Sequence, residues 1–182
     1  MAMPADRFIP RVVIVPARDE DIPAISSIYA HHVRHGLASF ETEPPTLKEM
    51  SRRRAELRAN GFAYLAAFFD DRLVGYAYAG PYRERRAYRF TVEDSIYVDP
   101  GFLGLGIGRM LLYALLHESE LRGFRRMIAV IGDSANEASI KLHARCGFAM
   151  AGTLRSVGLK HGRWVDCVLM QRSLGEENQT SP

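Results

Sequence analysis

The sequence predicts a mixed α/β domain, in which a mostly antiparallel sheet is flanked by helices. Short runs of β-branched and aromatic residues alternate with segments whose apolar residues recur at helical spacing. The apolar runs 63–69 and 73–79 flank a polar turn at residues 70–72, which is typical of an antiparallel hairpin. The later order of strand, helix and strand across residues 88–131 indicates one parallel crossover.

The N-terminal part is expected to form a strand, two helices and the hairpin. Residues 11–15 predict the strand, and residues 36–45 a loop. A helix over residues 19–32 follows from apolar residues at helical spacing, namely Ile22, Ile25, Ile28 and Tyr29. Thr46, three residues before Glu49, has capping-box spacing and predicts a second helix that runs to about Ala59 and is ended by Asn60-Gly61. The arginines at 52–54 on that helix are expected to face solvent.

The C-terminal part is expected to complete the sheet. A polar loop at residues 80–87 precedes a long strand at residues 88–98. Two more helices are expected at residues 105–122 and 136–146, and further strands at residues 126–131, 148–156 and 163–171.

The length and composition indicate one globular domain, which we place at residues 1–174, with a polar, disordered tail at 175–182. The longest apolar run, 62–69, is too short to cross a membrane, and the first ten residues lack the apolar block of a secretory signal. Cys146 and Cys167 are too few for a disulfide framework and lack metal-ligand spacing. We therefore expect reduced thiols, a cytoplasmic location and no metal.

The net charge of +3 makes the chain mildly basic. This charge is compatible with a nucleic-acid partner, but no nucleic-acid-binding motif accompanies it. An anionic cofactor explains the same surplus, so we expect neither a nucleic acid nor a membrane as partner.

A glycine-rich segment carries the strongest functional signal. Gly104, Gly106 and Gly108 lie between a strand and a helix, where bare backbone N–H groups and the helix dipole favour a phosphate. No Walker pattern is present, and the dinucleotide pattern fails because its last glycine is replaced by Arg109 or Leu111. The segment predicts a phosphate-bearing cofactor, with a plain glycine-rich turn as the alternative.

The segment 103–108 resembles the pyrophosphate loop of the GNAT superfamily of N-acetyltransferases, [QR]-x-x-G-x-[GA], although Leu103 stands in place of Gln or Arg. This departure removes one side-chain donor and leaves the backbone cradle. The element order also matches the GNAT fold over almost the whole chain. The resemblance implies acetyl-CoA as co-substrate, bound by Gly104, Leu105, Gly106, Ile107, Gly108, Arg109 and Asn136, and along the backbone of Ile96, Tyr97 and Val98.

Several further segments resemble the phosphinothricin (methionine sulfoximine) N-acetyltransferases, namely residues 88–95, 130–136, 139–143, 147–148 and 152–166 and, more loosely, 40–45. Such enzymes transfer acetyl from acetyl-CoA to the α-amine of a small toxic glutamate analogue. The resemblance therefore implies a detoxification or resistance role and a homodimer.

Glu93 is the candidate general base, acting through a water, since the attacking amine must be neutral. Strand alternation is expected to point Glu93 and Ser95 to one face, and Asp94 and Ile96 to the other. A lone strand carboxylate is otherwise a solvated or paired charge. Because positioning contributes more than the base, losing Glu93 should impair turnover without abolishing it. Backbone amides of a bulged strand would polarise the carbonyl.

His143 stands where many GNAT enzymes carry a tyrosine that protonates the departing thiolate, and a histidine can do the same near neutral pH. A histidine simply packed on its helix is equally compatible. For the substrate, arginine forks suit a carboxylate and a second anionic group. By family position we expect Arg83, Tyr88 and Glu93 to contact the substrate, and Phe40 to close the pocket. Trp164 is expected in the core or in a dimer interface.

Two other functions stay open from the sequence. One is an acetyltransferase for protein N-termini or ribosomal proteins, which needs an open groove for a peptide. The other is a binding module that senses acetyl-CoA without turnover. No Cys/His pair suggests a covalent enzyme intermediate.

Overall fold

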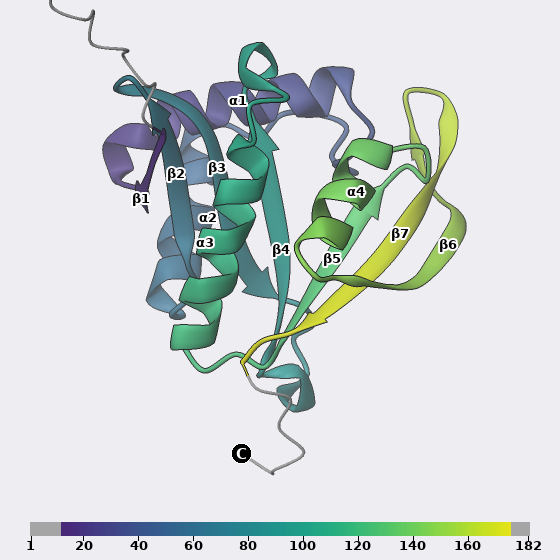
Figure 1. Cartoon of the computed structure of the whole chain (residues 1–182). Coiled ribbons are helices and arrows are strands. Elements are labelled where there is room, and N and C mark those ends of the chain that lie inside the picture. The colour runs from purple at the N-terminus through teal and green to yellow at the C-terminus, as the bar shows by residue number, and fades with distance from the viewer. Residues whose placement is uncertain (1–11, 176–182) are drawn as a thin grey trace, which may run out of the picture.

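The computed structural model describes residues 12–175 as one seven-stranded sheet with helices on both faces (Figure 1). The strands lie in the order β1-β2-β3-β4-β5-β7-β6, and β4 and β5 form the one parallel pair among them. This is the mixed, mostly antiparallel α/β fold that the sequence predicts. The strands are β1 (Val12–Pro16), β2 (Tyr64–Phe69), β3 (Arg72–Pro81), β4 (Thr91–Val98), β5 (Arg126–Gly132), β6 (Ala149–Lys160) and β7 (Arg163–Ser173).

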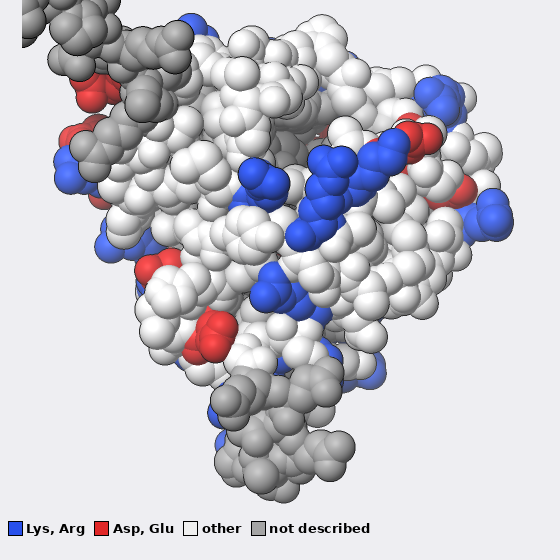
Figure 2. All heavy atoms as spheres, in the orientation of Figure 1, with Lys and Arg blue, Asp and Glu red and all other residues white. Residues whose placement is uncertain are grey.

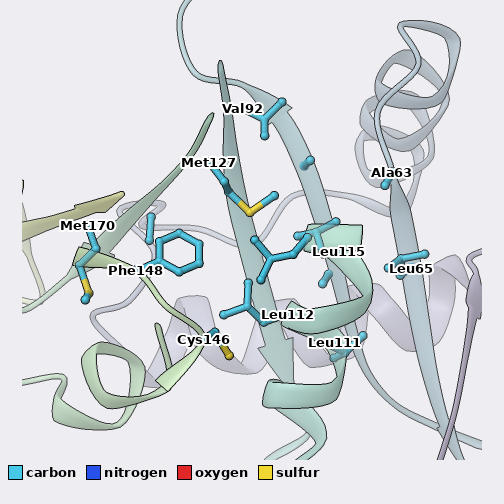
Figure 3. Close-up of a cluster of buried hydrophobic side chains, with 14 of the residues drawn as sticks. Ala63, Leu65, Val92, Leu111, Leu112, Leu115, Met127, Cys146, Phe148 and Met170 are labelled. Atoms are coloured by element: carbon cyan, nitrogen blue, oxygen red, sulfur yellow. The ribbon is translucent and has the colours of Figure 1, made fainter. Parts of the chain in front are cut away.

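Helices cover both faces and form two apolar clusters with the sheet between them. α1 (Ile22–His35) and α2 (Leu47–Ala59) pack with the tyrosines of β2 and β3. α3 (Ile107–Leu121) and α4 (Glu137–Arg145) cover the opposite face. Figure 3 shows leucines of α3, among them Leu112, pointing toward Met127 of β5. Truncating such a fully buried leucine to alanine would cost about 2–5 kcal/mol.

β4 and β5 separate part of the way along their length. Their register ends at Asp94↔Ala129, whereas β4 continues beside β3 as far as Val98. The two strands therefore diverge, as Figure 1 shows, and the β4 edge beyond Asp94 faces a gap. The β3–β4 register runs without a shift from Gly75↔Val98 to Pro81↔Val92, so the expected bulge in β4 was wrong. The divergence of the sheet, and not a bulge, frees that backbone edge.

Several sequence-based boundaries differ from the structure by three or four residues. β4 begins at Thr91 and not at Tyr88, because Arg86–Tyr88 form a short 3₁₀ helix in which the Tyr88 N–H bonds locally to Arg85 O at 2.9 Å. α1 runs to His35, and a 3₁₀ turn at Asp19–Asp21 precedes it. β6 extends to Lys160, well beyond the predicted end.

Arg54 was wrongly expected to face solvent. Its side chain is 2% exposed, and its guanidinium donates to Ala17 O and pairs with Asp19. The N-cap at Thr46 is confirmed, since its Oγ1 accepts from Glu49 N at 3.2 Å. Residues 1–11 and all of the predicted tail except Gly175 lie outside the described residues.

Candidate active site

The glycine-rich segment forms the entrance to α3, as the sequence predicts. Gly104 and Gly106 have positive φ angles of 78° and 80°, a conformation that glycine adopts without strain. Gly106 is the N-cap and has no side chain to cap the helix. The amides of Ile107, Gly108 and Arg109 precede the first helical hydrogen bond, from Met110 N to Gly106 O, and are free for an anion.

A cleft of about 970 Å³ extends from this loop into the gap between β4 and β5. It is lined by all of the predicted cofactor residues except Leu105, whose side chain is 57% exposed. Arg109, Lys141 and Arg145 line it as well, and Figure 2 shows Lys and Arg side chains gathered beside a hollow near α3 and α4. Bare helix amides, positive side chains and a free strand edge fit a long ligand with a diphosphate group.

Asn136 lies where the sequence predicts, at the N-cap of α4. Its Oδ1 accepts a hydrogen bond from Ser139 N at 3.2 Å, and the residue also lines the cleft. The Asn136 side chain therefore caps α4 and also lies where a ligand bound in the cleft would meet it.

A second pocket, of about 690 Å³, lies on the α1–α2 side of the sheet. Its tyrosines stack on one another, with the Tyr64 and Tyr78 ring centroids 5.2 Å apart. Of the residues expected to contact the substrate, Arg83 and Tyr88 line this pocket, whereas Glu93 and Phe40 are not among its lining residues. Phe40 packs instead beside Gly158 of β6. The other charged and aromatic lining residues of the pocket include Tyr29, Tyr76, Arg53, Arg85, Arg86 and Arg89. An aromatic pocket rimmed by arginines suits a small anionic amphiphile.

Glu93 points to the face of this pocket, as the strand alternation predicts. It makes no ion pair or side-chain hydrogen bond within residues 12–175. Burial, and then the charge of Asp94, raise the pKa of Glu93 to about 7, against the opposing charge of Arg83. A carboxylate with this pKa can accept and release a proton near neutral pH.

Asp94, the next residue, points to the opposite face and meets His143 of α4. His143 Nε2 lies 3.0 Å from Asp94 Oδ2, and Nδ1 lies 2.8 Å from Ser139 O. Burial alone would lower the pKa of His143, but the hydrogen bond and charge of Asp94 outweigh it and raise that pKa. His143 is packed, at 4% exposure, and also lines the cleft, so its position is compatible with either sequence-based interpretation.

Three features of the site were not predicted from the sequence. Strand alternation assigned Asp94 to the correct face of β4, but its hydrogen bond with His143 was not predicted. His32 Nε2 lies 2.8 Å from Val98 O and fixes the end of the free strand edge. The alternating Tyr76 and Tyr78 were a readable signal for a tyrosine-lined face. Trp164, by contrast, is 66% exposed and is not a core residue.

Neither a metal centre nor a membrane anchor is found in the described part of the chain. Over residues 12–175, no group of three or more His, Cys, Asp or Glu side chains could hold a metal ion. Within the same range, no helix is long and apolar enough to cross a membrane.

A cleft with bare helix-entrance amides and an aromatic pocket rimmed by arginines, on the two sides of the sheet, form the arrangement expected of an acetyltransferase. The chain belongs to the acetyltransferase (GNAT) family, whose model matches residues 25–148. The family prediction from the glycine loop is thereby confirmed.

Individual proteins similar to this chain are named as acetyltransferases of phosphinothricin or of methionine sulfoximine and methionine sulfone. The phosphinothricin N-acetyltransferase of Alcaligenes faecalis is 54% identical over 165 residues, covering 91% of this chain and 84% of the relative. The L-methionine sulfoximine/L-methionine sulfone acetyltransferase of Salmonella typhimurium is 36% identical, covering 86% and 91%. A phosphinothricin acetyltransferase from Sinorhizobium meliloti, crystallised with AcCoA, superposes with a TM-score of 0.91 at 43% identity, covering 94% and 92%.

Proposed function

We propose that this protein transfers the acetyl group of acetyl-CoA to the α-amine of a small amino-acid analogue such as phosphinothricin, methionine sulfoximine or methionine sulfone. One observation carries the proposal. The Glu93 side chain lies on the tyrosine-bearing face of β4, where it is close enough to Tyr78 and Arg83 of the pocket for their charges to interact, whereas Asp94 and the free edge of the strand line the cofactor cleft. The amine and the acyl donor would thus meet across a single strand.

Each residue has a definite role in this proposal. Acetyl-CoA supplies the thioester that the amine attacks. The amides of residues 104–109 bind the diphosphate, and the edge of β4 from Ile96 to Val98 binds the pantetheine amides. Arg83 and Tyr88 orient the substrate, with Phe40 at the margin of the site. Glu93 takes the ammonium proton through a water, and His143 donates a proton toward the departing sulfur.

The test is release of free thiol from acetyl-CoA on addition of each amine. We expect phosphinothricin, methionine sulfoximine and methionine sulfone to release thiol, and a panel of peptides to release little. Turnover of peptides alone would favour the N-terminal or ribosomal-protein acetyltransferase. Binding of acetyl-CoA without release for any amine would favour a sensor.

The same proposal covers the extent of the domain, its location in the cell, its partners and its biological role. We take residues 1–174 as one acetyltransferase domain acting in the cytoplasm, with no nucleic acid or membrane partner and with a role in resistance to the toxic analogue. Expression in a phosphinothricin-sensitive bacterium should raise the inhibitory concentration, and a Glu93→Gln variant should not. A homodimer is supported by apolar side chains exposed on the β6–β7 hairpin, Leu154, Val157, Leu159 and Trp164. Light scattering that gives a monomer mass at micromolar concentration would contradict the dimer.

A further inference from the structure

Lys160, the last residue of β6, is buried in a way that charged side chains rarely are. It is 1% exposed, and its Nζ donates to the backbone carbonyl of Ser39 at 2.5 Å. Its burial lowers the pKa of Lys160, with Glu41 opposing this effect. Within residues 12–175 the ammonium group has no direct carboxylate partner, and burying it in this way is costly, so this contact calls for an explanation beyond packing.

The contact belongs to a set that fixes one segment, residues 36–41, which we term the crossing loop. Its Ser39 Oγ lies 2.9 Å from Tyr29 Oη and accepts from the Glu41 amide at 3.2 Å. The Glu41 carboxylate pairs with Arg53 of α2 at 2.5 Å. The loop is therefore tied to α1, to α2 and, through Lys160, to the far hairpin of the sheet.

Two glycines let the crossing loop lie directly on the sheet. At Gly132, the end of β5, an added Cβ would overlap the carbonyls of Leu37 and Ala38. At Gly158 of β6 it would overlap the ring of Phe40. Both contacts leave no space for a larger residue, so the position of the loop is closely defined.

The crossing loop borders the cofactor cleft directly and reaches the tyrosine pocket through its hydrogen bond to Tyr29. Leu37 and Ala38 line the cofactor cleft together with Ser95 and Gly132, whereas Tyr29, bonded to Ser39, lines the tyrosine pocket. The loop spans from α1 to the end of β5 across the gap where β4 and β5 diverge. Its position therefore limits the space left for an acyl group in the cofactor cleft.

We propose that Lys160 is a positioning residue that holds the crossing loop as a wall of the cofactor cleft, and so restricts the enzyme to short acyl donors. This inference rests on the proposed function. One additional methylene in a closed apolar site changes selectivity by roughly 10–200-fold. Loosening the wall should therefore narrow the preference for acetyl over longer acyl groups.

The experiment compares acetyl-CoA, propionyl-CoA and butyryl-CoA as donors with one amine. In Lys160→Met, and in Gly132→Ala, which displaces the same loop from the opposite side, the acetyl-to-butyryl ratio of kcat/KM should fall about tenfold. Lys48→Met, at an exposed lysine of α2, is the matched control and should keep the wild-type ratio. A merely structural role would lower turnover of all three donors in proportion. An unchanged ratio in folded Lys160→Met and Gly132→Ala would overturn the proposal.

Two measurements without turnover separate this inference from the proposed function. Calorimetry should show that Lys160→Met loses discrimination between acetyl-CoA and butyryl-CoA in binding. Hydrogen exchange of the amides at residues 37–41 should accelerate in Lys160→Met and not in Lys48→Met. If these changes occur while wild-type protein releases no thiol, the positioning role stands and the proposed reaction fails. If the exchange and the binding ratio both stay as in wild type, the positioning role fails.

Discussion

The neighbouring carboxylates Glu93 and Asp94 lie in contrasting surroundings on the two faces of β4. Asp94 is 7% exposed and holds His143 at 3.0 Å on the cofactor side. Glu93 is half-buried on the pocket side, has no ion-pair partner within residues 12–175, and has its pKa raised to about 7. One strand can therefore supply two different acids, because alternation gives each carboxylate a separate environment. The paired carboxylate orients a neighbour, whereas the unpaired one is ready to exchange a proton.

Breaking the buried pair of Asp94 and His143 should have the largest effect, a loss of stability of the fold. Asp94→Ala leaves His143 without its partner, and removing one member of a buried pair costs about 3–5 kcal/mol. Because the folded-state pKa of His143 is raised, its pair stabilises most below the unfolded value of 6.5, and this gain is lost as pH rises through the folded value. Urea unfolding at several pH values should therefore show the gap between wild type and Asp94→Ala narrowing at alkaline pH. An equal loss in Glu93→Ala would remove the contrast between the two faces.

The second largest effect is expected on turnover, when the other carboxylate, Glu93, is substituted. Glu93→Gln should lower kcat by about 10²-fold, within the range for a general base, and leave acetyl-CoA binding unchanged. In wild type, kcat/KM should rise through pH 7, because Glu93 acts as a base only above its pKa of about 7. Thiol release across pH 5.5–9 should lose this limb in Glu93→Gln. A wild-type-like rate and profile would exclude Glu93 from the mechanism.

Substitutions on the two sides of the site should also change different Michaelis constants, one that for acetyl-CoA and the other that for the amine. Gly106→Ala forces a left-handed conformation on a residue with a Cβ, at a cost of roughly 1–2 kcal/mol, and should raise the KM for acetyl-CoA about tenfold. Arg83→Gln should raise the KM for the amine by a similar factor and leave that for acetyl-CoA unchanged. Because Arg83 opposes the raised pKa of Glu93, its loss should also move the kcat/KM limb to higher pH. If either variant raised both constants equally, the two pockets would not be independent.

Much of this site could be predicted from the sequence, because its cofactor side is built from backbone. Gly104 and Gly106 adopt the left-handed conformation that favours glycine, and such a requirement is visible in a short segment. Strand alternation likewise assigned Glu93 and Asp94 to the correct faces. The Asp94–His143 pair and the Lys160–Ser39 contact join residues 49 and 121 positions apart, so no local pattern reveals them. Arg54 was misassigned for the same reason, since Ala17 and Asp19, its partners, belong to another segment.

We expect the smallest effect from Glu93→Gln on stability, and it should be opposite in sign to that of Asp94→Ala, since removing the Glu93 charge should stabilise the fold. The raised pKa of Glu93 means that folded protein holds its proton more tightly than unfolded protein, whose value is near 4.5. Wild-type stability should therefore fall as pH rises from about 4.5 to about 7, and Glu93→Gln should lack this fall. Above pH 7 the variant should be more stable than wild type by roughly 1 kcal/mol, since one pKa unit is worth about 1.4 kcal/mol and Glu93 is partly solvated. At pH 4 the two should coincide.

Urea unfolding at pH 4 and pH 8 measures this difference, with Glu84→Gln, an exposed carboxylate of the same pocket, as the matched control. Glu84→Gln should follow wild type at both pH values. A variant that gains stability at pH 8 while losing most of its turnover would mean that the Glu93 charge is retained for chemistry at the expense of the fold. If Glu93→Gln were instead destabilised at pH 8, the carboxylate would have a favourable partner in solution, and its resemblance to Asp94 would outweigh the difference.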